Sequence, residues 1–189
     1  PFHWGVLFIF CGHLIAFLIP RTVLAWNSQP VRLLILEISA FIFGISMLVG
    51  LVNLFIRRYT TPRLYPVTNK MDFVVYVLLI LQTFTGLWIA YNFRWGSSWF
   101  STLLSPYLNS IFKLNPDITA VVLLPWTVKL HIAGAFIIIG ILPFSRLIHM
   151  LVLPLNYIWR PYQQVMWYWD RKKVRNRKTP WSLQRPKNT

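Results

Sequence analysis

The side chains in this sequence with the clearest chemical potential are its four histidines. They form two pairs, His3 with His13 and His131 with His149, and each pair lies in a long apolar stretch. An ionisable side chain within a membrane segment is costly, so its presence there points to a function. Neutral imidazole is also a common metal ligand. The four histidines therefore predict a metal-binding site within apolar surroundings.

The spacing of the histidines places them at two levels. His131 and His149 are 18 residues apart, which is five turns of an α-helix, about 27 Å along one face. His3 and His13 are 10 residues apart, about 15 Å along the axis and roughly 80° out of phase. Helix tilt or a kink at Pro143 would have to absorb that phase difference. If the two segments run antiparallel, His3 pairs with His149 and His13 pairs with His131.

Two histidines at each level suit a flat macrocycle held from both faces. The pattern predicts two b-type haems, very roughly 20 Å apart along the membrane normal. Two imidazole ligands leave no open position on the iron, which favours electron transfer over substrate chemistry. Zinc would need its ligands at one level. The four carboxylates, Glu37, Asp72, Asp117 and Asp170, are too dispersed for a hard-cation or di-iron site. The single cysteine, Cys11, cannot hold an iron–sulfur cluster alone.

Other side chains near the histidines are candidates for contacts with haem. Arg146 lies three residues before His149 and so on nearly the same side of a helix, where it could bind a haem propionate. Lys129 has a similar place before His131, although snorkelling to the interface explains it equally well. Three glycines could let a macrocycle approach the backbone closely. Small residues are also common wherever membrane helices contact one another, which explains these glycines without a macrocycle. They are Gly5, Gly12 and Gly134.

Four apolar segments must position these residues. The chain is 56% hydrophobic and 12% charged, against about a quarter charged in a soluble domain. Each segment is close to the ~20 residues that cross a membrane as a helix. We therefore expect an all-α integral membrane bundle over residues 1–159 and a basic tail over 160–189. A fifth, N-terminal span is expected before Pro1. The four segments are Phe2–Ile19, Leu33–Ile56, Phe73–Phe93 and Thr127–Leu153.

The net charge of +15 is distributed as in a membrane protein rather than in a nucleic-acid-binding protein. Nine of the 19 Lys and Arg residues lie in the last 30 positions, and four lie in the connection 57–70. The positive-inside rule places both on the cytoplasmic side, which fits four alternating spans. The connection 94–126 is aromatic-rich; within it Trp99–Phe112 could form an interfacial helix, or a loop anchored by its aromatic residues.

Several of these stretches resemble the gamma subunit of respiratory nitrate reductase, a membrane di-haem cytochrome b. The resemblance runs from Phe2 to about Val165 and is most specific in the histidine spacings. The stretches are Phe2-His3-Trp4-Gly5, Gly12-His13, Lys129-Leu130-His131, Pro143-Phe144-Ser145-Arg146-Leu147-Ile148-His149 and Arg160-Pro161-Tyr162-Gln163.

The resemblance implies the same pairing, with His3 and His149 on the inner haem and His13 and His131 on the outer one. It also implies that menaquinol or ubiquinol is oxidised near the outer haem. Electrons would leave from the inner haem to an iron–sulfur beta subunit and then to a molybdenum alpha subunit that reduces nitrate. The chain would thus be the electron-transfer subunit of an oxidoreductase, with no nitrate-reducing site of its own.

The sequence departs from the family at the quinol site. The family's lysine beyond the second histidine has no counterpart here, and Arg32 is the nearest basic residue. Gly12, His13 and Arg32 are therefore the quinol-site candidates. Arg32 could donate a hydrogen bond to a quinone carbonyl or could equally anchor the chain at lipid headgroups.

Two other functions stay open at this stage. One is a related haem-b subunit of the type associated with sulfite reduction, which differs in its iron–sulfur partner. The other is a haem-free membrane anchor or transporter in which the histidines relay protons. That function calls for acidic partners at the depth of the histidines, whereas Glu37 and Asp72 lie near segment ends.

Overall fold

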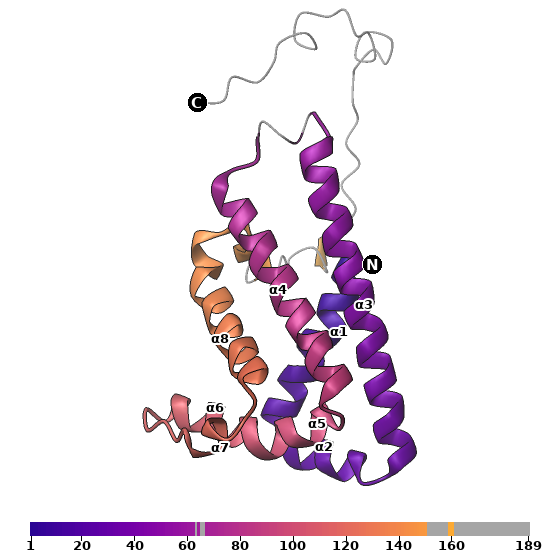
Figure 1. Ribbon diagram of the computed structural model, residues 1–189, viewed down its shortest axis with the longest axis vertical. Helices are drawn as coiled ribbons and strands as arrows, with labels where there is room; N and C mark the ends of the chain where they lie inside the picture. Colours follow the sequence, from indigo (N-terminus) through magenta and orange to yellow (C-terminus); the bar gives the residue numbers. More distant parts are fainter. Residues whose placement is uncertain (63, 65–66, 151–158, 161–189) are drawn as a thin grey trace, which may run out of the picture.

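The chain folds into a bundle of helices. The structure, a computed structural model, describes residues 1–62, 64, 67–150 and 159–160, and the regular elements in these residues are all helical. In the bundle, α1 packs on α3, α3 on α4 and α4 on α8, and Figure 1 shows all four running lengthwise. This confirms the predicted all-α bundle. The four helices are α1 (Phe2–Leu18), α3 (Pro30–Thr60), α4 (Lys70–Asn92) and α8 (Trp126–Ile141).

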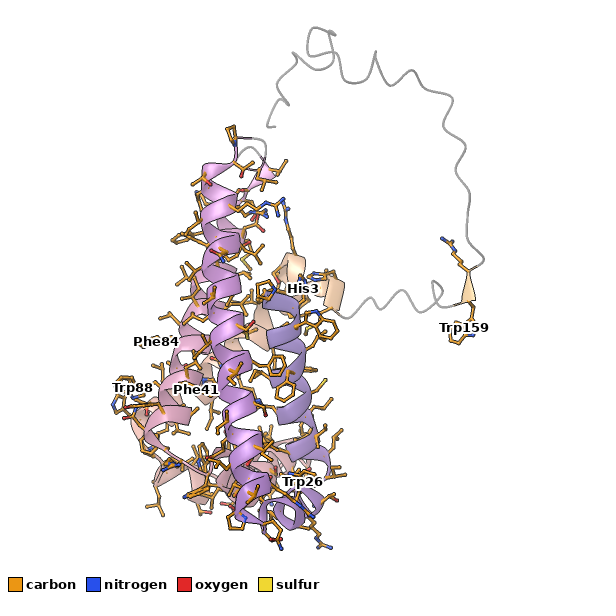
Figure 2. All side chains as sticks on the ribbon, turned by 90° about the vertical axis from the view of Figure 1, so that its right-hand side faces the viewer. His3, Trp26, Phe41, Phe84, Trp88 and Trp159 are labelled. Carbon is orange, nitrogen blue, oxygen red and sulfur yellow. The ribbon has the colours of Figure 1, made fainter. Side chains whose placement is uncertain are left out.

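Length and composition allow these helices to cross a membrane. The helices Pro30–Thr60 and Lys70–Asn92 qualify, as does α8 together with its 3-10 extension to Phe144. The helix α1 qualifies as part of a bent pair with α2 (Pro20–Asn27). Large apolar side chains also cover the sides of the bundle, as Phe84 and Trp88 do on α4 (Figure 2). Such a surface belongs in lipid.

Short helices form a layer across one end of the bundle, here called the end layer (Figure 1). Of the two alternatives for Trp99–Phe112, a helix or an anchored loop, the structure has the helical one, and helical structure already begins at Gly96. The α3–α4 connection lies at the opposite end (Figure 1). The end layer comprises α2, α5 (Gly96–Trp99), the π-helical turn η2 (Phe100–Leu104), α6 (Ser105–Phe112) and α7 (Thr119–Val122).

The helix α2 was not predicted. Pro20 begins it, and the axis turns by 106° between α1 and α2. Proline fits the first position of a helix, where no internal hydrogen bond needs its missing N–H, but it cannot continue the preceding helix. The helix α1 therefore ends at Leu18, and the chain enters the end layer.

Glycines set how closely α1 approaches α3. A Cβ atom on Gly50 would lie 2.6 Å from the Phe2 backbone nitrogen, and one on Gly5 would lie 2.7 Å from the carbonyl oxygen of Phe43. Both positions must be glycine for the helices to meet at this distance. Gly5 thus serves helix packing, the second of the two roles that the sequence left open for it, and is not free to face a macrocycle.

The predicted continuous helix Thr127–Leu153 is wrong. The helix α8 ends at Ile141, and a 3-10 turn, η3 (Leu142–Phe144), and an extended Ser145 separate it from a second 3-10 segment, η4 (Arg146–Met150). Pro143 causes the break, because its ring lacks an N–H and clashes with the preceding turn. The argument that His131 and His149 share a face after five regular turns therefore fails. Residues 151–153 and the tail 161–189 lie outside the described residues.

Candidate haem-binding site

The four histidines lie on α1, on α8 and in the 3-10 segment that follows α8. His3 and His13 belong to α1, His131 belongs to α8, and His149 lies in η4. His3 lies at the height of the η3–η4 segment (Figure 2), and the ring of His13 meets that of Phe100 in the end layer. The chain reaches His149 by a different path from the continuous helix expected from sequence, and the pairing of the histidines by level stays a prediction.

The ring of His13 is held by a backbone hydrogen bond and an aromatic contact. Its Nδ1 donates to the carbonyl oxygen of Ile9 at 2.8 Å, because a carbonyl can only accept. Its edge meets the ring of Phe100 with the centroids 5.4 Å apart and the planes at 86°. The lone pair is therefore on Nε2, on an exposed side chain. A backbone hydrogen bond on one ring nitrogen is the usual support for a histidine that binds metal through the other.

The second histidine of the inner level has the same support. Nδ1 of His149 donates to the carbonyl oxygen of Arg146 at 2.6 Å, which again leaves the lone pair on Nε2. The side chains of His149 and His3 are both exposed. His3 makes an edge contact with Phe2, with the ring centroids 5.2 Å apart.

His131 instead faces α4. Its Nδ1 lies 2.9 Å from Oγ1 of Thr85, and its Nε2 lies 3.2 Å from the amide nitrogen of Gln82. Gln82 also donates to the carbonyl oxygen of His131 at 3.0 Å. The sequence interpretation missed both partners. The available signal was the presence of polar residues in the apolar run of α4.

Two glycines complete the contact between α4 and α8. A Cβ atom on Gly86 would lie 3.0 Å from Cε1 of His131, and one on Gly134 would contact Oε1 of Gln82. Gly134 therefore makes room for Gln82 rather than for a macrocycle.

Arg146 has a carboxylate partner that the sequence did not reveal. Its Nε lies 3.3 Å from Oδ1 of Asp72, and its terminal nitrogen donates to the carbonyl oxygen of Val67 at 2.7 Å. Asp72 is buried and also binds Arg58 through its other oxygen at 2.7 Å. The Arg146 side chain is still 58% exposed, so part of its guanidinium remains accessible to a further anion.

The structure does not bring the three quinol-site candidates together by direct contact. Gly12 and His13 are neighbours on α1, and a Cβ atom on Gly12 would meet nothing within 4 Å. Arg32 lies in the first turn of α3, where its guanidinium carbon is 5.0 Å from the ring centroid of Trp26 in the end layer. Gly12 therefore presents open space beside His13, and Arg32 faces a cation–π partner.

The donor set is compatible with haem. Among the described residues, no three His, Cys, Asp or Glu side chains gather to hold a metal ion, whereas haem brings four nitrogen ligands of its own and needs only two from the protein. His13 and His149, one at each predicted level, each present an Nε2 lone pair on an exposed side chain, and the open space at Gly12 lies beside His13.

Comparison with known proteins decides the family. The model of the nitrate reductase gamma subunit family matches residues 1–168. The chain belongs to the nitrate reductase gamma subunit family. Among similar gamma subunits, the nitrate reductase gamma chain of Bacillus subtilis (strain 168) is 29% identical over 164 residues, covering 85% of this chain and 74% of that protein.

Two further relatives show how widely this unit occurs. The respiratory nitrate reductase 2 gamma chain of Escherichia coli (strain K12) is 29% identical over 168 residues, covering 87% of this chain and 74% of the relative. The nitrate reductase-like protein NarX of Mycobacterium tuberculosis (strain H37Rv) is 28% identical over 173 residues, covering 85% of this chain but 26% of that protein. This gamma subunit is accordingly a membrane component of a nitrate reductase, an oxidoreductase complex.

Proposed function

We propose that this chain is the quinol-oxidising subunit of the complex and that it carries electrons across the membrane through two b-type haems. The observation that carries the proposal is the state of His13. Its Nδ1 is held by the carbonyl oxygen of Ile9, its Nε2 is free to bind iron, and its proposed partner, His131, lies on α8. A packing histidine has no need of a free, exposed ring nitrogen.

Each level would hold one haem. His13 and His131 would bind the outer haem, and His3 and His149 the inner one. The bound iron supplies reversible one-electron transfer. The protein supplies ring orientation through the carbonyl oxygens of Ile9 and Arg146, and the exposed part of Arg146 is available to a propionate.

Quinol oxidation is assigned to the outer level, beside Gly12 and His13. Either menaquinol or ubiquinol is small enough at its ring to approach a backbone without side chains, and the open space at Gly12 offers such an approach. Arg32 would contribute from the end layer only after leaving the Trp26 ring. Proton release at this level, with electrons travelling to the other, would store energy as membrane potential.

Electrons would leave at the inner level, at the end that carries the α3–α4 connection. Arg57 and Arg58 close α3 at that end, so the positive-inside rule orients it to the cytoplasm. An iron–sulfur beta subunit would accept the electrons there and pass them to a molybdenum alpha subunit. Lipid surrounds the apolar sides of the bundle.

The test is a reduced-minus-oxidised visible spectrum of the purified membrane complex, with haem and protein both quantified. Two b-type haems per chain, reducible by a quinol analogue, are expected. His13→Ala should remove the outer haem and His149→Ala the inner one. The two variants should therefore lose different components of the haem spectrum. A flat spectrum in the unaltered complex would overturn the proposal. If the purified complex contained both haems but no molybdenum subunit, the electron-transfer role would stand and only the assignment to nitrate reduction would be overturned.

A further inference from the structure

We propose that Thr85 of α4 is a positioning residue for the outer haem, because it fixes the tautomer of His131. This inference rests on the proposed function, since it concerns how His131 is prepared to bind iron. It assigns α4, a helix without histidines, a direct part in the outer site.

The hydrogen bonds around Thr85 have one consistent direction. Oγ1 of Thr85 lies 2.9 Å from the carbonyl oxygen of Leu81 and 3.0 Å from that of Gln82. Carbonyl oxygens can only accept, so the single hydroxyl proton of Thr85 has a partner on its own helix. Oγ1 is then able to accept from Nδ1 of His131 at 2.9 Å, an arrangement that puts the proton of the neutral imidazole on Nδ1.

Gln82 gives the same answer independently. Its amide nitrogen is a donor only, and it lies 3.2 Å from Nε2 of His131. Nε2 must therefore carry the lone pair. The two contacts come from different side chains and define one tautomer, the one in which Nε2 can bind iron.

The ring is also confined by its surroundings. Gly86 lies so close that a Cβ atom there would be 3.0 Å from Cε1 of His131. If the imidazole proton moved to Nε2, it would point at the amide protons of Gln82, and Nδ1 would lose the proton that it donates to Thr85. The geometry thus disfavours the alternative tautomer twice.

The two partners have different roles. Gln82 divides its amide protons between the carbonyl oxygen of His131 at 3.0 Å and Nε2 at 3.2 Å. Iron binding would take the Nε2 lone pair from Gln82 and leave the carbonyl bond in place. The Thr85 bond is on the other nitrogen and is compatible with ligation. A hydrogen bond on that nitrogen raises the basicity of the ligand and so stabilises the ferric state.

Thr85→Val tests the proposal in the purified membrane complex, because valine keeps the shape and removes the hydroxyl group. Thr83→Val is the matched control. Thr83 lies two residues away on the same helix, is buried, and its Oγ1 donates to the carbonyl oxygen of Leu79 at 2.7 Å. Thr83→Val therefore removes the same kind of local bond without changing the contacts of His131. Thr85→Ser restores the hydroxyl group.

The readouts are haem retention at the outer level and the midpoint potential of the outer haem in a redox titration. Thr85→Val should weaken retention by about 10–100-fold, as loss of a ligand's hydrogen-bond partner does, and should shift the potential of the remaining outer haem upward. Thr83→Val should change neither quantity, and Thr85→Ser should restore both. Thr85→Val with two haems at unchanged potentials would overturn the inference. An unaltered complex without haem would instead overturn the proposed function.

Discussion

Arg146, just beyond α8, and Asp72, in the first turn of α4, form an ion pair with Nε 3.3 Å from Oδ1. Asp72 also binds Arg58 at the end of α3 at 2.7 Å and caps α4 in a reciprocal pair with Asn69. One buried carboxylate therefore joins three segments at the end of the bundle that carries the α3–α4 connection.

Asp72→Asn should destabilise this end strongly. The substitution keeps the cap acceptor but leaves Arg58, whose side chain is only 17% exposed, without its charge partner. A loss of about 1–3 kcal/mol is expected for a buried polar group deprived of its partner. Arg146→Gln should cost less than about 1 kcal/mol, because the Arg146 side chain is 58% exposed. Unfolding in detergent compares the two variants, and equal effects would contradict the ranking.

Gly12→Ala should reduce haem content at the outer level while leaving the polypeptide stable. Its Cβ atom would meet no protein atom within 4 Å, so the methyl group can obstruct only a bound group. Gly140→Ala is the control, because its Cβ atom also meets nothing within 4 Å and it lies on α8. Visible spectra of both variants give the answer. A full complement of haem in Gly12→Ala would show that the macrocycle does not approach this face.

Gly50→Ala should lower the stability of the bundle, in contrast to Gly12→Ala, which should lower its haem content. Its Cβ atom would lie 2.6 Å from the backbone nitrogen of Phe2, and backbone cannot move aside without separating α1 from α3. A cost of about 1–3 kcal/mol is typical of such overpacking. Thermal unfolding in detergent should show the loss, with Gly140→Ala again as the control. An unchanged unfolding midpoint would mean that α1 does not sit this close to α3.

Asp117, in the loop before α7, should make that helix sensitive to acid. The hydroxyl and backbone N–H groups of Thr119 donate to its carboxylate at 2.7 and 3.0 Å, and these bonds lower the pKa of Asp117 below its ordinary value of 3.8. A lowered folded-state pKa contributes stability above pH 3.8 that is lost as the pH falls through the folded value.

Thr119→Val should bring the pKa of Asp117 closer to its ordinary value, because it removes the hydroxyl group that is the largest cause of the lowered pKa. Hydrogen exchange of the α7 amides, followed from about pH 5 to pH 2, measures the change. The variant should lose protection at a higher pH than the parent protein. Identical profiles would count against the bond to Thr119.

The apolar segments could be predicted well from sequence, because whether a helix can cross a membrane is decided mainly by its length and apolar composition. The segment predicted at Phe73–Phe93 is the helix Lys70–Asn92, and that predicted at Leu33–Ile56 is the core of Pro30–Thr60. The additional turns at their ends are polar, and a hydropathy pattern does not register them. They form because the backbone continues to satisfy its own hydrogen bonds beyond the lipid.

The helix geometry around His149 could not be predicted by counting turns. Counting assumes one regular rise, and Pro143 replaces it with two 3-10 segments around an extended Ser145. The proline was visible in the sequence, but whether it kinks a helix or ends it depends on neighbours that accept the freed backbone groups. Arg146, which binds Asp72 from the far end of another helix, is part of that new arrangement.

The partners of His131 were missed for a different reason. Thr85 and Gln82 are 46 and 49 residues from His131 along the chain, and no spacing rule within one helix relates them. Their approach depends on Gly86 and Gly134, which let α4 and α8 come close. Which faces of two helices meet is decided by packing of the whole bundle.

The π-helical turn of the end layer holds two residues, Phe100 and Ser105, against α1 at the same time. The backbone N–H of Ser105 donates to the carbonyl oxygen of Phe100, five positions earlier. In a regular α-helix these residues would lie about 140° apart around the axis, yet here both face α1. Phe100 meets the ring of His13, and the hydroxyl group of the fully buried Ser105 donates to the carbonyl oxygen of Ala16 at 2.9 Å. An ordinary α-helical turn over the same five positions would rotate one of these contacts away, so the wider π-turn is what keeps both on the side of α1. Deletion of one residue between them would leave them four positions apart, about 40° around the axis of a regular α-helix, so both contacts should survive a one-residue deletion better than a one-residue insertion.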